Sequence, residues 1–210
     1  MTCARYAALL LFGFLCAGCG VKRVPQDLLA RLPYEARIEL LEAENDYALA
    51  IDHLDEAQAE VAHTRDQLRR AKDRLSAAES EVSRAEDKTS QEVATLAVAE
   101  AEARVEYLRA RQSVNVKNEG LQKQNRRCAQ ARFEQARLTV ARKAKIEGSE
   151  SLSPEEFEAQ VKSCDADALE LRTAMKEQTS GAAAAKEAWE KQKSALAKKT
   201  FDARASPYVE

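Results

Sequence analysis

Cysteine and histidine are the side chains of this chain best suited to chemistry. The two histidines, His53 and His63, are ten residues apart, so they do not have the spacing of three or four that lets two helical side chains share a metal ion. The sequence has no Gly-rich phosphate loop, no Cys-x-x-Cys pair and no serine in a nucleophile elbow. We therefore expect no catalytic residue, no metal site and no cofactor, and the chain is not predicted to be an enzyme.

Cys128 and Cys164 are the two cysteines beyond the first nineteen residues, and they are a candidate disulfide. In an oxidising compartment such a pair can persist as a disulfide. A straight helical hairpin turning at 148–153 would nevertheless leave them offset by about nine residues, or roughly 13 Å along the axis. That offset exceeds the usual Cα separation of a disulfide. An intramolecular bridge, two buried free thiols and an intermolecular bridge all remain open.

Residues 1–19 have the layout of an export signal. Arg5 precedes an apolar run over residues 7–15, which is too short to span a bilayer as a mature helix. The run ends in Cys16-Ala17-Gly18-Cys19, which resembles the lipobox of bacterial lipoproteins. The first position departs from the usual pattern, because Cys16 stands where Leu, Val or Ile is common. The resemblance covers this segment alone.

The lipoprotein resemblance implies a processed and lipidated chain. In that class, the signal over residues 1–18 is removed and Cys19 becomes the first residue, diacylated on sulfur and acylated on its amine, with palmitate among the acyl chains. Gly20 follows in place of the Asp that favours the inner membrane, which implies an outer-membrane lipoprotein. Three acyl chains exceed what stable anchoring requires. We expect the body to face the periplasm, with a surface orientation as the alternative.

A heptad repeat over residues 40–106 is the longest pattern in the chain. Bulky apolar residues recur at every seventh position from Leu40, and small residues, mostly alanine, follow three positions later. The repeat is clean for about seven heptads and then weakens. Keeping such a stripe against a partner requires helices that supercoil around each other. The repeat predicts an all-α fold, an elongated coiled coil of long helices with a shorter C-terminal helix folding back. Opposite charges four residues apart, such as Glu100 and Arg104, are expected on its solvated faces.

The expected organisation has six parts. They are the signal at 1–18, the lipidated cysteine and a tether at 19–33, one long helix at 34–147, a turn at 148–153, a C-terminal helix at 154–199 and an irregular tail at 200–210. The stretch 113–120 contains Gly120 and two asparagines, which lower helix propensity. The long helix is expected either to reverse there or to continue through it. Two apolar stripes over 121–146 indicate contact with two neighbouring helices.

The boundary before the last helix carries the clearest stop and start signals. Gly148 suits the end of a helix, and Pro154 suits the first position of the next one. Ser153 is expected to cap that helix in a capping box with Glu156. Further along the same helix, Trp189 occupies an apolar seam position, where we expect it to pack in a core.

These patterns favour a structural or protein-interaction role in the cell envelope. The net charge is −2 and the signs are interspersed, so no nucleic-acid partner is expected. Expected partners are the membrane, through the lipid anchor, and either a second copy or a helical envelope protein that covers the seam. One alternative is a helical-hairpin subunit of a trans-envelope export, efflux or motility complex, with its reversal near Gly120. Another is a periplasmic chaperone that grips clients between helical arms.

Overall fold

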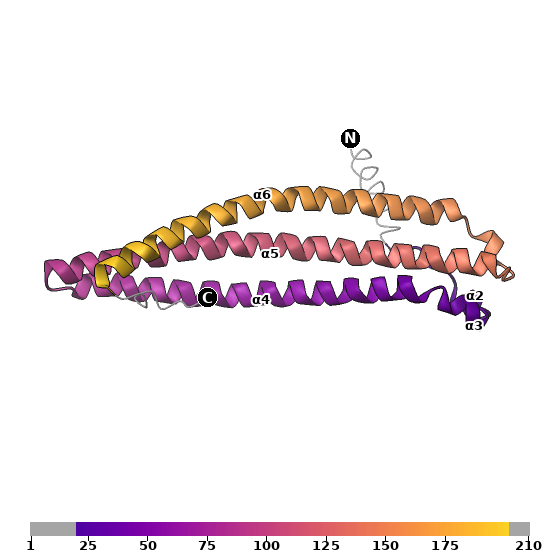
Figure 1. Cartoon of the computed structure of the whole chain (residues 1–210), viewed down its shortest axis with the longest axis horizontal. Coiled ribbons are helices and arrows are strands. Elements are labelled where there is room, and N and C mark those ends of the chain that lie inside the picture. Colours follow the sequence, from indigo (N-terminus) through magenta and orange to yellow (C-terminus); the bar gives the residue numbers. More distant parts are fainter. Residues whose placement is uncertain (1–19, 202–210) are drawn as a thin grey trace, which may run out of the picture. The chain divides into compact units, whose positions relative to one another are not determined.

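The computed structural model describes residues 20–201, and this part of the chain is all-α, without strands, as the heptad repeat predicted. The signal over 1–18 and the lipidation site Cys19 lie outside the described residues, as does most of the predicted tail. Figure 1 shows the elements in order along the chain. They are α2 Gln26–Ala30, α3 Tyr34–Ile38, α4 Leu41–Arg84, α5 Lys88–Lys143, the 3₁₀ helix η1 Ser149–Ser151 and α6 Pro154–Thr200.

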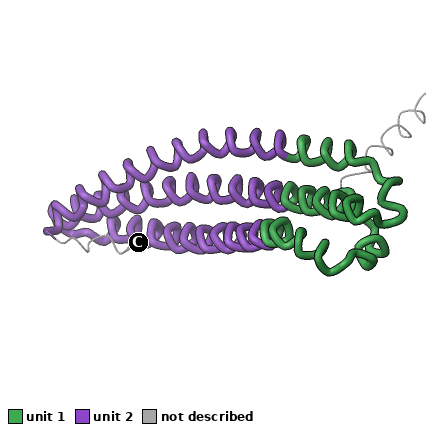
Figure 2. The backbone as a smooth tube through the Cα atoms, turned by 45° about the vertical axis from the view of Figure 1, so that its right-hand side comes forward, with its two compact units in different colours: residues 1–47, 127–164 green, residues 48–126, 165–210 purple. Residues whose placement is uncertain are grey.

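These elements are divided between two compact units, shown in Figure 2. The described part of unit 1 comprises residues 20–47 and 127–164, and that of unit 2 comprises residues 48–126 and 165–201. Helices α4, α5 and α6 each contribute one segment to both units. The same three helices therefore build two separate cores.

The prediction of one long helix over 34–147 is wrong, because the chain turns at residues 85–87 between α4 and α5. Within unit 2, Arg111 Nη2 donates to Glu60 Oε1 at 2.8 Å, and Asn115 Nδ2 donates to Thr64 Oγ1 at 2.7 Å. One turn further along α4, Leu68 shares a core with Val105 and Leu108. From Thr64 to Leu68 on α4, the partners on α5 therefore run back from Asn115 to Leu108 and Val105, so the two helices are antiparallel within unit 2.

No reversal occurs at 113–120, where α5 continues as a regular helix. The asparagine at 115 is satisfied by α4, since its amide bonds Thr64 and also lies 3.4 Å from Glu60 Oε1. A Cβ built on Gly120 would meet nothing within 4 Å, so this glycine marks no close approach of two backbones. Contacts with α4 outweigh the helix-propensity cost of about 1 kcal/mol that one interior glycine imposes.

The heptad seam of α4 is covered by the same chain. Its buried members are Leu54, Ala57, Val61, Thr64, Leu68, Ala71 and Ala78. In unit 2, Leu68 and Ala71 pack with Val105 and Leu108 of α5 and with Trp189 of α6. Within unit 2 this seam therefore packs against helices of the same chain, while a second copy or a helical envelope protein stays a prediction.

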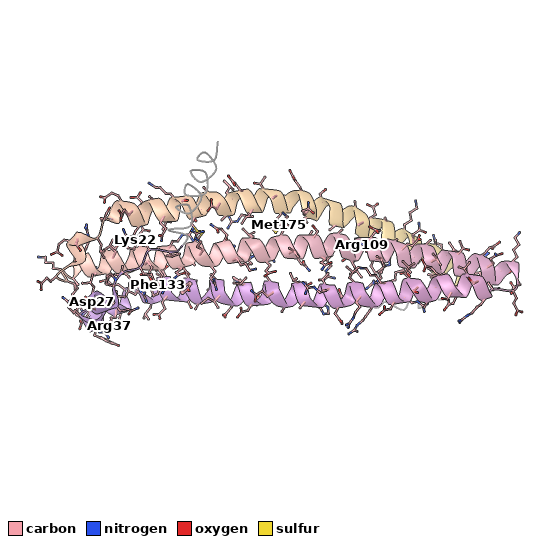
Figure 3. All side chains as sticks on the ribbon, turned by 180° about the vertical axis from the view of Figure 1, so that it is seen from behind. Lys22, Asp27, Arg37, Arg109, Phe133 and Met175 are labelled. Carbon is pink, nitrogen blue, oxygen red and sulfur yellow. A yellow bond between two sulfur atoms is a disulfide. The ribbon has the colours of Figure 1, made fainter. Side chains whose placement is uncertain are left out.

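Unit 1 packs both sides of the 127–143 segment of α5, which confirms the prediction of two neighbours. On one side, Phe133 and Val140 form a cluster with Leu32, Ala36 and Leu40. Figure 3 labels Phe133, whose ring stacks with Tyr47 of α4 at a centroid distance of 6.1 Å. On the other side, Leu138 packs with Phe157 of α6. Each neighbour thus has its own apolar stripe on α5.

Candidate anchoring and docking sites

The segment over 20–33, named here the lead-in segment, is packed rather than free, so the prediction of a tether at 19–33 is wrong. Val24, Leu28 and Leu32 along it are all buried. Val24 and Leu28 join Leu138 of α5 and Phe157 of α6 in one cluster. The sequence signal was the apolar spacing of these three residues, which the flanking Pro25 and Pro33 obscured because they break any longer helical pattern.

Hydrogen bonds fix the first residues of the lead-in segment to α5 and α6. The backbone N–H of Lys22 donates to Gln160 Oε1 at 2.7 Å, and that of Val24 donates to Glu134 Oε2 at 2.9 Å. The Lys22 ammonium also pairs with the carboxylate of Glu156. The described chain is therefore held from its third residue onward, and Figure 3 labels Lys22 at this point.

Glu134 is buried, and it accepts a second hydrogen bond from Arg137 Nη1 at 2.8 Å. A buried carboxylate is tolerated only where such donors satisfy it. One oxygen therefore accepts from the lead-in segment and the other from α5. The sequence alone does not single out Glu134, because a single carboxylate carries no pattern.

The start of α6 is capped by Ser153, as predicted, but the Ser153 hydroxyl bonds the side chain of Glu155 rather than forming the full capping box with Glu156. The Glu156 N–H donates to Ser153 Oγ at 3.3 Å, while Ser153 Oγ donates to Glu155 Oε2 at 2.7 Å. The bond from Ser153 lowers the pKa of Glu155. The Glu156 carboxylate, which the capping box would have turned back to Ser153, instead pairs with Lys22.

Arg142 holds the connection between α5 and α6. Its guanidinium donates to the carbonyl oxygens of Ser149, Glu150 and Leu152 at 3.3, 3.2 and 2.7 Å. Gly148 adopts a φ of 92° at the start of η1, five residues after α5 ends at Lys143. The left-handed glycine therefore shapes the connection and does not terminate the helix directly.

Cys128 and Cys164 form a disulfide in unit 1, with a Cα–Cα distance of 5.4 Å. The structure thus selects the intramolecular bridge among the three alternatives. The predicted offset was too large because α5 ends at Lys143 rather than near 147. Cys128 lies fifteen residues before that end and Cys164 ten residues after the start of α6, and the connection over 144–153 takes up the difference.

Trp189 is 1% exposed in unit 2, which confirms its predicted packing role. Its indole N–H donates to Glu100 Oε1 at 2.7 Å, and its ring stacks on Tyr107 at 5.5 Å. The Arg104 guanidinium lies 4.3 Å from the ring centroid. Glu100 and Arg104 are therefore buried around the indole, and their expected place on a solvated face is corrected.

The α4–α5 connection at 85–87 is polar and capped. Asp87 Oδ1 accepts from the N–H groups of Thr89 and Ser90 at 2.7 and 2.9 Å, and these bonds, chiefly those to Ser90, lower the pKa of Asp87. A groove of about 500 Å³ lies beside this turn. Its lining is Glu81, Arg84, Ala85, Asp87, Thr89, Ser90, Val93, Ala94 and Ala97.

Neither a membrane-spanning helix nor a metal cluster is found within residues 20–201. None of these helices is both long enough and apolar enough to cross a bilayer. No group of three or more His, Cys, Asp and Glu side chains in the same range is arranged to hold a metal ion. His53 pairs with Glu56 on the surface of α4.

Comparison of the chain with protein-family models, curated proteins and solved structures gives no match.

Proposed function

We propose that this chain is an exported lipoprotein, anchored by Cys19 in the outer membrane with its helical body facing the periplasm. It acts there as a structural or protein-interaction module of the cell envelope. The observation that carries the proposal is the lipobox-like sequence that ends at Cys19. The Cys128–Cys164 disulfide supports export, because disulfides persist in oxidising compartments and are rare in the cytosol.

Metabolic labelling tests the anchor. The full-length chain and a Cys19→Ser variant are produced in a Gram-negative host with an alkyne-tagged palmitate, and the envelope is fractionated on a density gradient. We expect label on the parent protein in the outer-membrane fraction and none on Cys19→Ser. A Cys128→Ser/Cys164→Ser double variant is the control and retains the label. A parent protein that carries no acyl label would contradict the proposal.

The antiparallel α4–α5 pair favours a second candidate, a helical hairpin that docks into a trans-envelope export, efflux or motility complex. The turn at 85–87 presents exposed charges beside the groove with its alanine-rich lining. This is the hairpin that such docking requires, located at 85–87 rather than near Gly120. A photo-crosslinker at Glu86 tests it, with the same group at exposed Arg70 as control. An export-complex subunit identified only in the position-86 adduct would support docking, and identical adducts at both positions would contradict it.

A further inference from the structure

The chain between the lipidation site and the first fixed residue of the fold is very short. Only Gly20 and Val21 separate Cys19 from Lys22. Three consecutive Cα–Cα steps span at most about 11 Å. Lys22 itself is held by its backbone bond to Gln160 and by its ion pair with Glu156. Because this connection is so short, Lys22 and the part of unit 1 that holds it cannot lie far from an acyl group on Cys19.

This distance is comparable with the dimensions of a bilayer surface. The polar headgroup layer on each side of the hydrocarbon core is roughly 5–8 Å thick. A helix with its side chains is about 10 Å across. If the acyl chains of Cys19 occupy the hydrocarbon core, Lys22 and the adjoining first turns of α6 lie within reach of the headgroups.

One exposed side chain at this place, that of Arg23, suits a phosphate group. Residues 21–25 have no helical structure, and Val24 is buried while its neighbour Arg23 is exposed. Lys22 is already engaged by Glu156, whereas the Arg23 side chain faces solvent. A guanidinium offers several donors in a planar fork that matches phosphate oxygens.

We propose that residues 22–24 and the adjoining exposed surface of α6 around Ala159 form a membrane-contact face, with Arg23 binding lipid phosphate groups. The proposal rests on the lipid anchor at Cys19. It goes further by assigning one face of unit 1 to the bilayer. A lipidated chain whose body hung free on a flexible tether would not have such a face.

Headgroup quenching tests the contact face on the full-length lipidated protein. A fluorophore is placed on Ala159→Cys or on the control Asn45→Cys, both exposed positions of unit 1. The disulfide and the lipid occupy the native thiols, so each variant carries one label. In vesicles of phosphatidylethanolamine and phosphatidylglycerol with a headgroup nitroxide, we expect several-fold stronger quenching at position 159 than at 45. Equal quenching at the two positions would overturn the proposal.

A linker variant shows whether the short connection causes the contact. Twelve Gly and Ser residues inserted between Gly20 and Val21 add roughly 20 Å of flexible reach. We expect this variant to remain lipidated and vesicle-bound while position 159 loses its excess quenching. Quenching that is unchanged by the linker would overturn the proposal.

Charge variants test the role of Arg23. Arg23→Glu should lower the quenching at 159, and Arg23→Lys should largely preserve it; no effect of Arg23→Glu would overturn the phosphate contact. Failure of the anchor is distinguishable from failure of the contact face. A protein that is not acylated does not bind the vesicles. A lipidated protein without a contact face binds them, but its quenching is equal at positions 159 and 45.

Discussion

Trp189 shows how one residue of a coiled-coil seam can hold polar partners as well as apolar ones. Its ring stacks on Tyr107 and lies under the Arg104 guanidinium, while its N–H bonds Glu100. A purely apolar contact of this size would tolerate a shift of one helix along another. A directed hydrogen bond in a buried site does not, so these residues fix the register of α6 on α5 within unit 2.

Replacing Trp189 by Phe should therefore destabilise the protein even though an aromatic ring remains. Loss of the N–H donor to the buried carboxylate is expected to cost about 1–3 kcal/mol. Trp189→Ala should cost more, about 3–5 kcal/mol, because a cavity is added. Urea unfolding followed by circular dichroism measures both changes. Phe201→Ala is the control, since Phe201 is 97% exposed and its loss should cost less than about 0.5 kcal/mol. Wild-type stability of Trp189→Phe would contradict the assigned hydrogen bond.

Asp87 should stabilise the fold by an amount that depends on pH and is lost under acidic conditions. Bonds from Ser90 and Thr89 hold the pKa of Asp87 below its ordinary value of 3.8. A carboxylate with a lowered pKa in the folded state stabilises the fold at pH values above its unfolded pKa, and the contribution disappears as pH falls through the folded pKa. Asp87→Asn should lower the thermal midpoint at about pH 6, and the difference from the wild type should shrink as the pH falls below the ordinary pKa of 3.8. The neighbouring Glu86→Gln is the control, and a pH-independent difference for Asp87→Asn would contradict this account.

At the scale of whole elements, the course of α5 shows where sequence reasoning succeeds and where it fails. The weak helix formers at 113–120 mark a real change in the seam, but their polar side chains bond Thr64 and Glu60 and the helix continues. The true turn at 85–87 has neither Gly nor Pro, the usual signals of a break. Its only trace in the sequence is the capping residue Asp87, followed by polar Thr89 and Glu92 at seam positions. Helix propensity alone predicts neither the continuous helix at 113–120 nor the turn at 85–87, because tertiary contacts outweigh it.

Glycine substitutions in the connection and in α6 should act in opposite directions. Gly148→Ala should destabilise unit 1, because φ is 92° and the new Cβ would lie 3.3 Å from Leu28 Cδ2. A left-handed residue with a Cβ costs about 1–2 kcal/mol before that contact is counted. Gly181→Ala should stabilise α6 by up to about 1 kcal/mol, since its position in the helix is open. Thermal unfolding compares the two variants, and a shift of the same sign in both would contradict the prediction.

The disulfide joins α5 to α6 and should be a main source of stability for unit 1. The two cysteines are 36 positions apart, and closing a loop of this length stabilises a fold by about 2–4 kcal/mol. We expect reductant to lower the urea midpoint of the wild type and to leave the Cys128→Ser/Cys164→Ser variant unchanged. Intact mass with and without thiol alkylation verifies the redox state. A wild-type midpoint that is indifferent to reduction would contradict a stabilising bridge.

For the whole molecule, periodicity predicts the fold class and residue context decides the connections. The heptads of α4 and the Ser153–Pro154 start of α6 are visible in the sequence, because they repeat or combine several local signals. The packing of the lead-in segment is not, since it depends on partners more than a hundred residues away, such as Glu134 for Val24. The disulfide lies between these two cases. Its cysteines are evident in the sequence, but their pairing depends on where α5 ends.

The distant partners of the lead-in segment also set an order of events on the proposed export route. A chain that crosses a membrane from its N-terminus delivers residues 22–24 first, while Glu134 and Gln160, to which they bond, emerge only after more than a hundred further residues. Throughout that interval the signal-proximal chain has nothing to dock against. On the proposed route, Cys19 would therefore meet the membrane enzymes that acylate and cleave a lipobox before residues 22–24 can pack against α5 and α6.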